Sequence, residues 1–227
     1  MLDVLAQASL RDEFVAWSWI NDRWDEVWEH TVDHVQLTLF AVAVGLLISV
    51  VLSAIALWWR PAYGPITWVT GFLYTIPSLA LFAFLVPITG LGFVTAEIAL
   101  VSYTLLILVR NIVAGVDGVS PAVKEAADAM GYTPVRRFLA IDLRLATPTI
   151  VAGVRIAAVT VVGLVSVAAL VGEGGYGVLI LDGLRRDFST PIVLGAVLSV
   201  VLAVAIDVAL LLVERALTPW ARRGVAR

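Results

Sequence analysis

Long stretches of apolar residues without a charged side chain dominate this chain. Two of them, at 35–59 and 61–96, contain no aspartate, glutamate, lysine or arginine. A helix that crosses a bilayer needs about 20 apolar residues, so the second stretch is too long for one helix, and the breaker residues from Pro87 to Gly90 divide it. The pattern predicts an all-α membrane protein with five spans, at about 35–59, 65–86, 92–113, 148–171 and 191–213.

The basic residues orient these spans, whose odd number places the two termini on opposite sides. Eleven of the 15 lysines and arginines lie in the segments on one side of the membrane, or just inside the span ends on that side. The other four lie in the segments on the opposite side. Lysine and arginine accumulate on the cytoplasmic side of membrane proteins. We therefore predict an external N-terminus, a cytoplasmic loop at 114–147 and a cytoplasmic basic tail at 218–227.

The segment 1–30 lacks the basic start and apolar core of a cleavable signal peptide. Aromatic residues recur in it at helical spacing, and tryptophan favours the headgroup layer. We expect an amphipathic helix on the outer membrane surface. The residues that define its face are Phe14, Trp17, Asn21, Trp24 and Trp28.

The two histidines, His30 and His34, lie four residues apart beside acidic residues. Their order along the chain is not the His-Glu-x-x-His pattern of a metal-binding helix. We interpret them as a solvated helix end and predict no metal site.

Composition narrows the class of protein further. Hydrophobic residues make up 61% of the chain and charged residues 15%, and the mean hydropathy is +0.98. These values exclude a disordered chain, a cytosolic enzyme and a nucleic-acid-binding domain, and the net charge of −3 leaves no basic surface for DNA or RNA. A membrane enzyme is disfavoured because no cysteine is present, no histidine lies within a predicted span and no catalytic pair of carboxylates is evident.

The chain has a single lysine, Lys124, and it is followed by Glu125. A phosphate-binding loop of the Walker type needs a glycine before the lysine and a serine or threonine after it. ATP chemistry must therefore come from a partner.

The predicted cytoplasmic loop contains two helix start signals with a glycine between them. Ser120-Pro121 starts a helix that extends to Met130, and Gly131 takes the left-handed position that ends it. Thr133-Pro134 repeats the start signal for a second short helix over 135–140. A helix-turn-helix DNA reader has a similar pattern, but a position between two spans argues against it. A purely structural connector remains an alternative.

The order Glu125-Ala126-Ala127, Gly131 and Ile141-x-Leu143 resembles the EAA loop of ABC importer permeases. The family usually has proline after that leucine, whereas this chain has Arg144, with Pro148 four residues later. Other segments resemble the permeases for glycine betaine, carnitine and choline. They lie at 75–81, 91–92, 110–111, 152–155 and 174–177.

The resemblance covers about 31–217 and implies the permease domain of a type I ABC importer in a bacterial-type cytoplasmic (inner) membrane. Its implied partners are ABC ATPase subunits, a second permease that is the same or a sister chain, an external substrate-binding protein and membrane lipid. It implies no cofactor on this chain and ATP with magnesium at the ATPase. The implied cargo is a compatible solute of the glycine betaine, carnitine, choline or proline type. The methionine-importer permeases share the loop and the five-span plan, so an amino-acid importer is the alternative.

By the same resemblance, Glu125, Ala126, Ala127 and Gly131 form a coupling helix that docks in a cleft of the ATPase, and Ile141 and Leu143 complete the motif. Small alanines allow close approach, a carboxylate offers a charge-assisted hydrogen bond, and glycine permits the sharp turn. An ion-driven secondary transporter would leave this loop unexplained and usually shows internal repeats, which are not visible here.

Pro77 falls inside the second predicted span and interrupts its hydrogen bonds. A break of this kind is tolerated where it lines a cavity or packs on protein. Tyr74, Ser78 and Leu81 would share its face, so we expect this face either to line the translocation path or to form a packing kink. Tyr74 and Phe82 are candidates for cation–π contact with a quaternary ammonium group.

Two charged residues fall inside the fourth and fifth predicted spans, and the position of each is about 10 Å deep at 1.5 Å per residue. Arg155 and Asp207 are therefore expected to pair, although each could extend to the interface separately. The small residues of the fourth span favour close helix packing. The glycine-rich segment 172–177 is expected to be an outer gate, a contact for the binding protein or a plain turn.

Overall fold

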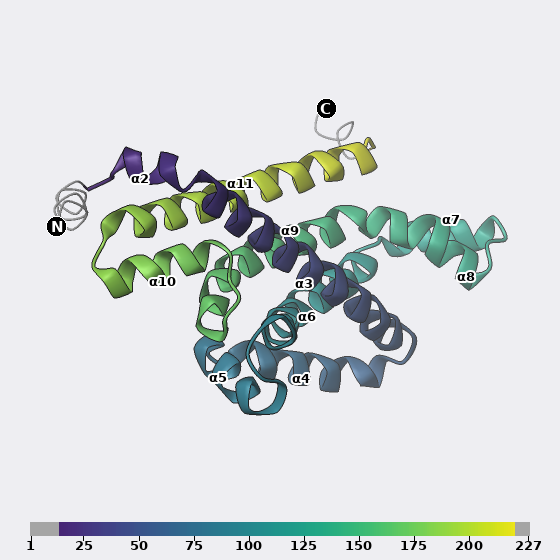
Figure 1. The fold of residues 1–227 in the computed structure, drawn as a ribbon. Coiled ribbons are helices and arrows are strands. Elements are labelled where there is room, and N and C mark those ends of the chain that lie inside the picture. The colour runs from purple at the N-terminus through teal and green to yellow at the C-terminus, as the bar shows by residue number, and fades with distance from the viewer. Residues whose placement is uncertain (1–13, 221–227) are drawn as a thin grey trace, which may run out of the picture. The chain divides into compact units, whose positions relative to one another are not determined.

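The computed structural model describes residues 14–220, and helices with short connections make up this part of the chain (Figure 1). Four of these helices are long and apolar enough to cross a membrane, and one broken pair adds up to a fifth span. The predicted all-α fold with five spans is confirmed at this level. The four long helices are α3 (Trp24–Trp58), α6 (Phe93–Asp117), α9 (Leu143–Ala168) and α11 (Ser189–Leu217), and the broken pair is α4 (Tyr63–Thr75) and α5 (Ser78–Thr89).

Shorter helical elements connect the long ones. They are α2 (Trp17–Asp22) before α3, η1 (Arg60–Ala62) before α4, α7 (Pro121–Ala129), α8 (Pro134–Arg137) and the π-helical η2 (Phe138–Asp142) between α6 and α9, and η3 (Ala169–Val171) and α10 (Tyr176–Arg186) between α9 and α11.

The chain divides into two compact units, and several long helices contribute to both. The first unit contains the described residues of 1–41 together with 76–100 and 160–204. The second unit contains 42–75, 101–159 and the described residues of 205–227.

The second predicted span, at about 65–86, is interrupted at Pro77 as expected, and the interruption separates two helices. α4 ends at Thr75, and α5 begins at Ser78 with Pro77 as its N-cap residue. Proline lacks a backbone N–H and disfavours helical geometry at the residue before it, and here the helix ends before Ile76. Pro87 lies inside α5, and the turn instead follows at Gly90 and Gly92, which both have positive φ.

The N-terminal aromatic segment is not one separate helix. α2 ends at Asp22, and α3 begins at Trp24 and continues without interruption into the first apolar stretch. Its 35 residues exceed the roughly 20 that a bilayer requires, so one end extends beyond the apolar layer. The side chains of Trp17, Trp24 and Trp28 are exposed, and the expected location on the outer surface stays a prediction. Residues 1–13 lie outside the described part.

In the second unit, α3 and α6 pack closely around small residues. Ala56, Val109 and Val113 form a buried cluster, and Leu52, Leu57, Tyr63 and Ile66 pack against it. A Cβ atom at Gly45 would lie 3.0 Å from Cβ of Thr104, which is shorter than ordinary side-chain contacts. Thr104 is fully buried. The absence of a side chain at Gly45 therefore allows this close approach of the two helices.

In the first unit, α10 lies beside the beginning of α11, with which it forms a helical hairpin (Figure 1). Gly183 faces Ile192 and Gly195 faces Ile180 across this hairpin. Its core consists of Val27, Tyr176 and Leu179, and the partly buried side chains packed on them are Trp19, Leu194, Leu198 and Leu202.

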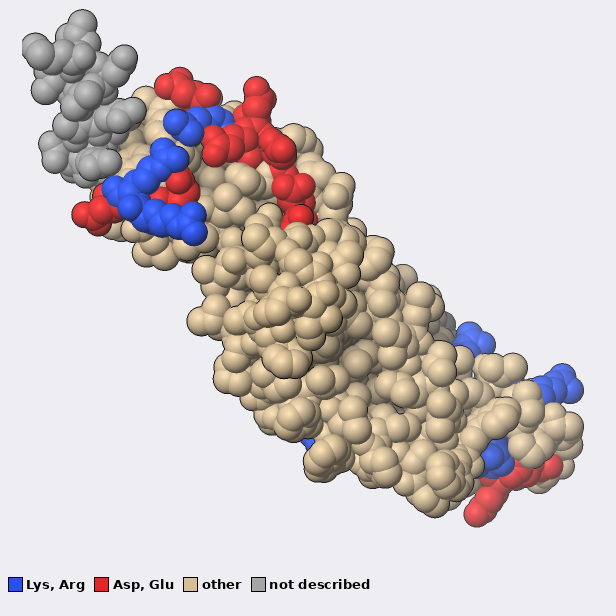
Figure 2. All heavy atoms as spheres, turned by 60° about the horizontal axis from the view of Figure 1, so that its bottom comes forward, with Lys and Arg blue, Asp and Glu red and all other residues tan. Residues whose placement is uncertain are grey.

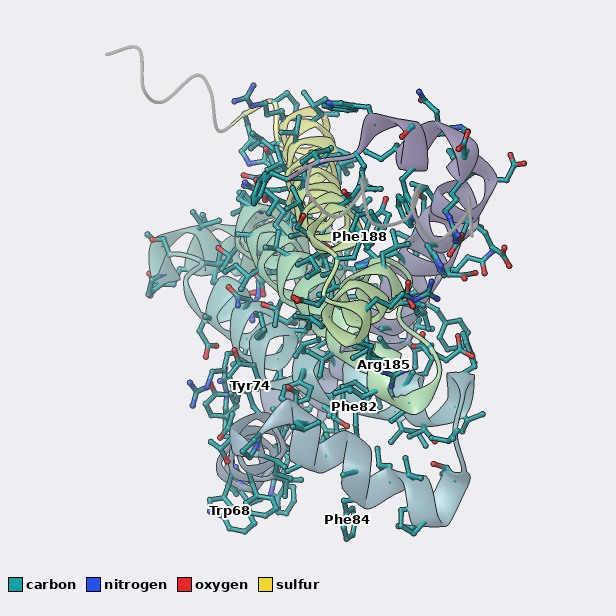
Figure 3. All side chains as sticks on the ribbon, turned by 60° about the vertical axis from the view of Figure 1, so that its left-hand side comes forward. Trp68, Tyr74, Phe82, Phe84, Arg185 and Phe188 are labelled. Carbon is teal, nitrogen blue, oxygen red and sulfur yellow. The ribbon has the colours of Figure 1, made fainter. Side chains whose placement is uncertain are left out.

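Much of the described surface is apolar, and Figure 2 shows a broad face on which few side chains carry a charge. Trp68 and Phe84 are 72% and 68% exposed, and both point away from the ribbon (Figure 3). None of the most apolar 18-residue window of α11 is buried inside the chain. Apolar patches of this extent mark contact with lipid or with another protein, as expected for a membrane protein.

Candidate functional site

The segment between α6 and α9 forms a helical hairpin with a tight turn. α7 ends in a turn where the N–H of Gly131 donates to Asp128 O at 3.0 Å and the N–H of Tyr132 donates to Ala127 O at 3.2 Å. Gly131 has φ +84°, a conformation that side-chain-bearing residues rarely adopt. Thr133 then caps α8 by accepting from Arg136 N. The predicted order of helix, glycine turn and helix is therefore present.

An ion pair holds this hairpin together, and a hydrogen bond connects its base to α6. Arg137 of α8 donates to Asp128 of α7 at 2.5 Å. At the base, Arg60 forms two hydrogen bonds with Asp117 at 2.8 and 2.6 Å, and Lys124 Nζ donates to Val116 O at 3.2 Å. Asp117 ends α6, and Arg60 follows α3. A force on α7 would therefore reach α6 directly through Lys124, and the segment after α3 indirectly through the pair of Asp117 with Arg60.

The hairpin exposes a carboxylate and apolar side chains together. Glu125 and Ala126 are exposed, whereas Ala127 is buried, so α7 presents one face outward and one face inward. Of the other predicted motif residues, Ile141 is half-buried in η2, and Leu143 is 38% exposed at the start of α9. The apolar side chains exposed on the hairpin are Val123, Met130, Val135 and Leu139.

The residues predicted to line the path do not form one helical face. Tyr74 lies in α4 of the second unit, whereas Pro77, Ser78 and Leu81 belong to the first unit. Tyr74 is partly exposed and contacts the edge of Tyr103 with ring centroids 5.9 Å apart. Leu81 and Phe82 are buried, so Phe82 does not present its ring to solvent in this conformation. The assignment of these residues to the path stays a prediction.

Arg155 of α9 lies against two carboxylates of α11. Its Nε and Nη2 atoms donate to the two carboxylate oxygens of Asp207 at 2.8 and 2.9 Å, which is a bidentate arrangement. Nη1 also donates to Glu214 at 3.4 Å. The first contact is the one predicted from the sequence, and the second was not expected. Glu214 follows Asp207 by seven residues, or about two helical turns, so the helical period would have placed it on the same face.

The glycine-rich segment after α9 is held against α3 by His34. The Nε2 atom of His34 lies 3.0 Å from Val162 O, and the N–H of Tyr176 donates to Nδ1 at 3.3 Å. A carbonyl at one nitrogen and an N–H at the other require a neutral ring with its hydrogen on Nε2. Gly175 has φ +47°, and a Cβ there would lie 2.5 Å from His34 Cβ. His34 therefore joins α3, α9 and α10.

The interpretation of His34 as part of a solvated helix end is wrong, because its side chain is fully buried. The first apolar stretch begins at residue 35, but the helix that contains it, α3, already begins at Trp24. Glu97 was also missed, although it is the single acidic residue in the predicted span 92–113 and could have been recognised there. It is 4% exposed in α6.

We expect His34→Leu to lower the melting temperature of the purified protein in detergent by about 2–12 °C. The substitution leaves the buried N–H of Tyr176 without an acceptor, which costs about 1–3 kcal/mol, and a chain of this size loses about 2–4 °C per kcal/mol. His30→Leu is the matched control, because Nδ1 of His30 has no hydrogen-bond partner in the described structure. Equal melting temperatures for wild type and His34→Leu would contradict the structural role of this ring.

Comparison with known proteins identifies the chain. Residues 45–219 match the family described as the binding-protein-dependent transport system inner membrane component. The chain belongs to this family. The resemblance found from the EAA loop is thereby confirmed.

Several relatives in this family are permeases for quaternary amines or osmoprotectants. A choline transport system permease protein of Bacillus subtilis is 35% identical over 83% of this chain and 87% of its own length. A glycine betaine/carnitine/choline transport system permease protein of the same species is 32% identical over 86% and 90%. An osmoprotectant import permease protein of Salmonella typhimurium is 31% identical over 83% and 90%.

Solved structures of ABC importers share the fold of this permease. The MetNI methionine ABC transporter in an inward-facing conformation has a TM-score of 0.68 at 22% identity, covering 90% of this chain and all of the other. An amino acid ABC transporter has a TM-score of 0.73 at 16% identity, covering 88% and 98%. Both matches confirm the type I importer permease fold.

Proposed function

We propose that this permease forms the membrane path of an ATP-driven importer for a compatible solute of the quaternary-amine type, such as glycine betaine, carnitine or choline. The observation that carries this proposal is the similarity to osmoprotectant and choline permeases over more than four-fifths of this chain and of each relative. The apolar helices that can span a membrane support a role as transport component in the inner membrane. We further propose that the N-terminus is external, and that the α7–α8 hairpin and the basic tail are cytoplasmic.

The α7–α8 hairpin would be the coupling element that docks in a cleft of the ATPase. The exposed carboxylate of Glu125 offers a charge-assisted hydrogen bond, and the exposed apolar side chains around it offer a surface to bury. The buried Ala127 and the turn at Gly131 would hold that surface in position. The contacts of Asp117 with Arg60 and of Val116 with Lys124 would transmit rigid-body motion of the ATPase to α3 and α6.

The complete importer would contain two permease subunits, two ATPase subunits, an external binding protein and surrounding lipid. ATP and magnesium would bind at the ATPase rather than at this chain. Among the described residues, no group of three His, Cys, Asp or Glu side chains is arranged to hold a metal ion.

The isolated chain should show no specific labelling when it is photo-crosslinked to ATP. Its single lysine, Lys124, lies in α7 without a glycine-rich phosphate loop, and its Nζ atom is already bonded to Val116 O. The purified ATPase partner serves as the positive control. Saturable labelling of this chain that excess unlabelled ATP removes would contradict this division of labour between permease and ATPase.

The cargo is tested by isolating the complex through a tag on this chain. The co-purified or co-expressed binding protein would be identified, and its tightly bound ligand determined by mass spectrometry. We expect a quaternary amine. Recovery of methionine or another ordinary amino acid would favour the alternative, an amino-acid importer with the same fold.

A further inference from the structure

Glu97 of α6 is a buried carboxyl group without a partner of its own. Glu97 is 4% exposed, and neither of its carboxylate oxygens accepts a hydrogen bond from the described residues. The nearest basic residue along α6, Arg110, follows 13 positions later, which is about 20 Å along a helix. An acidic side chain within a membrane helix is costly and is characteristic of a path for ions or substrates.

An aromatic ring on α6 lies one helical turn before this carboxyl group, and it contacts a second ring on α3. Phe93 precedes Glu97 by four residues, so the two side chains share one face of α6. The ring of Phe93 contacts the ring of Phe40 in α3 edge to face, with centroids 5.3 Å apart. Phe40 and Phe93 are 48% and 44% exposed, whereas the neighbouring Ala41 is fully buried. The rings are therefore accessible, whereas the carboxyl group on the same face of α6 as Phe93 is buried.

This combination suits a cation that carries no hydrogen-bond donor. A quaternary ammonium group has four alkyl substituents, so it interacts with aromatic faces and with a negative charge but donates no N–H. A metal ion would need several oxygen or nitrogen ligands, and no cluster of metal-ligating side chains exists within residues 14–220. A primary ammonium ion would need hydrogen-bond acceptors for its three N–H groups.

We propose that Glu97, Phe40 and Phe93 form a binding site within the membrane for the trimethylammonium group of the transported solute. The inference rests on the proposed function, because it takes its ligand class from that function. Glu97 is shielded in this conformation, so the solute would meet the two half-exposed rings first and the carboxylate after α3 and α6 move apart at this end. The site would add recognition inside the permease to that of the external binding protein.

The test measures uptake by the whole complex in vesicles, with its ATPase and binding protein, for Glu97→Gln. Glutamine keeps the shape of the side chain and removes its charge. We expect the maximal uptake rate divided by KM for choline, a cation, to fall at least tenfold. The loss for zwitterionic glycine betaine should be smaller, because its own carboxylate already offsets the cation. Glu97→Asp should retain more choline uptake than Glu97→Gln, and Phe93→Leu should raise KM for both solutes.

Glu29→Gln is the matched control, because Glu29 is an exposed glutamate on α3 of the same unit. Wild-type kinetics for Glu97→Gln would overturn the site and leave its carboxyl group a neutral packing element. If Glu97→Gln does not assemble into the complex, Glu97→Asp and Phe93→Leu test the site instead. Unchanged KM values in both variants would also overturn the proposal. Failure of the proposed function differs from failure of this site, because in the first case the wild-type complex would import no quaternary amine.

Discussion

Gly45→Leu should sharply reduce the amount of correctly folded permease. A Cβ at this position would lie 3.0 Å from Cβ of Thr104, an atom fixed to the backbone of α6. The added side chain therefore cannot be accommodated by a rotamer change and must separate α3 from α6. Overpacking of this kind costs about 1–3 kcal/mol or more, which corresponds to roughly a fivefold to more than a hundredfold change in the folded fraction.

The matched control for this substitution is Gly163→Leu in α9. Gly163 also lies within a long apolar helix, but a Cβ there would meet no atom within 4 Å. Size-exclusion chromatography of a fluorescently tagged chain measures the monodisperse fraction of both variants. Equal monodisperse fractions for the two variants would show that the contact of Gly45 with Thr104 does not limit folding.

Glu125→Ala should impair the coupling of ATP hydrolysis to transport while the helices remain inserted. Glu125 is exposed on α7, so its removal leaves no buried group unsatisfied in this chain. A charge-assisted hydrogen bond to a partner is worth about 1.5–3 kcal/mol, which is roughly tenfold to more than a hundredfold in the docking equilibrium. We therefore expect weaker capture of the ATPase, or a hydrolysis rate that loaded binding protein no longer stimulates.

Gly131→Val tests the same hairpin through its geometry, because a β-branched residue resists the φ of +84° at the turn. Both variants are measured by solute uptake and by ATPase rate in vesicles containing the complete importer. Glu29→Ala, an exposed acidic residue on α3 far from the hairpin in sequence, is the control. Full uptake and full stimulated hydrolysis in Glu125→Ala would contradict the coupling role and show that the hairpin only connects α6 and α9.

The sequence predicted the helical fold and the hairpin between α6 and α9 well because both depend on local signals. Proline at a helix start and glycine at a helix end act within a few residues, and Pro121 and Gly131 occupy these positions in the structure. The pairing of Arg155 with Asp207 followed from depth in the membrane, since two opposite charges in one apolar layer attract each other strongly. The same depth argument did not indicate Glu214, which contacts Arg155 near the end of α11.

Other features depend on contacts that sequence pattern does not reveal. His34 is a buried junction because Val162 and Tyr176, more than a hundred residues away, offer it an acceptor and a donor. The strength of the interruption at Pro77 was underestimated, since a proline can kink a membrane helix or end it, depending on its neighbours. Pro148 shows the opposite outcome, because α9 begins at Leu143 and continues through it.

One measurement tests both the importer assignment and the cargo. It is the uptake of labelled glycine betaine and choline into vesicles that contain this permease, its ATPase and its binding protein. We expect accumulation that requires ATP and loaded binding protein, and that excess methionine does not inhibit. Accumulation driven by an ion gradient without ATP would contradict the importer assignment. ATP-dependent uptake of methionine with no uptake of either quaternary amine would contradict the assigned cargo.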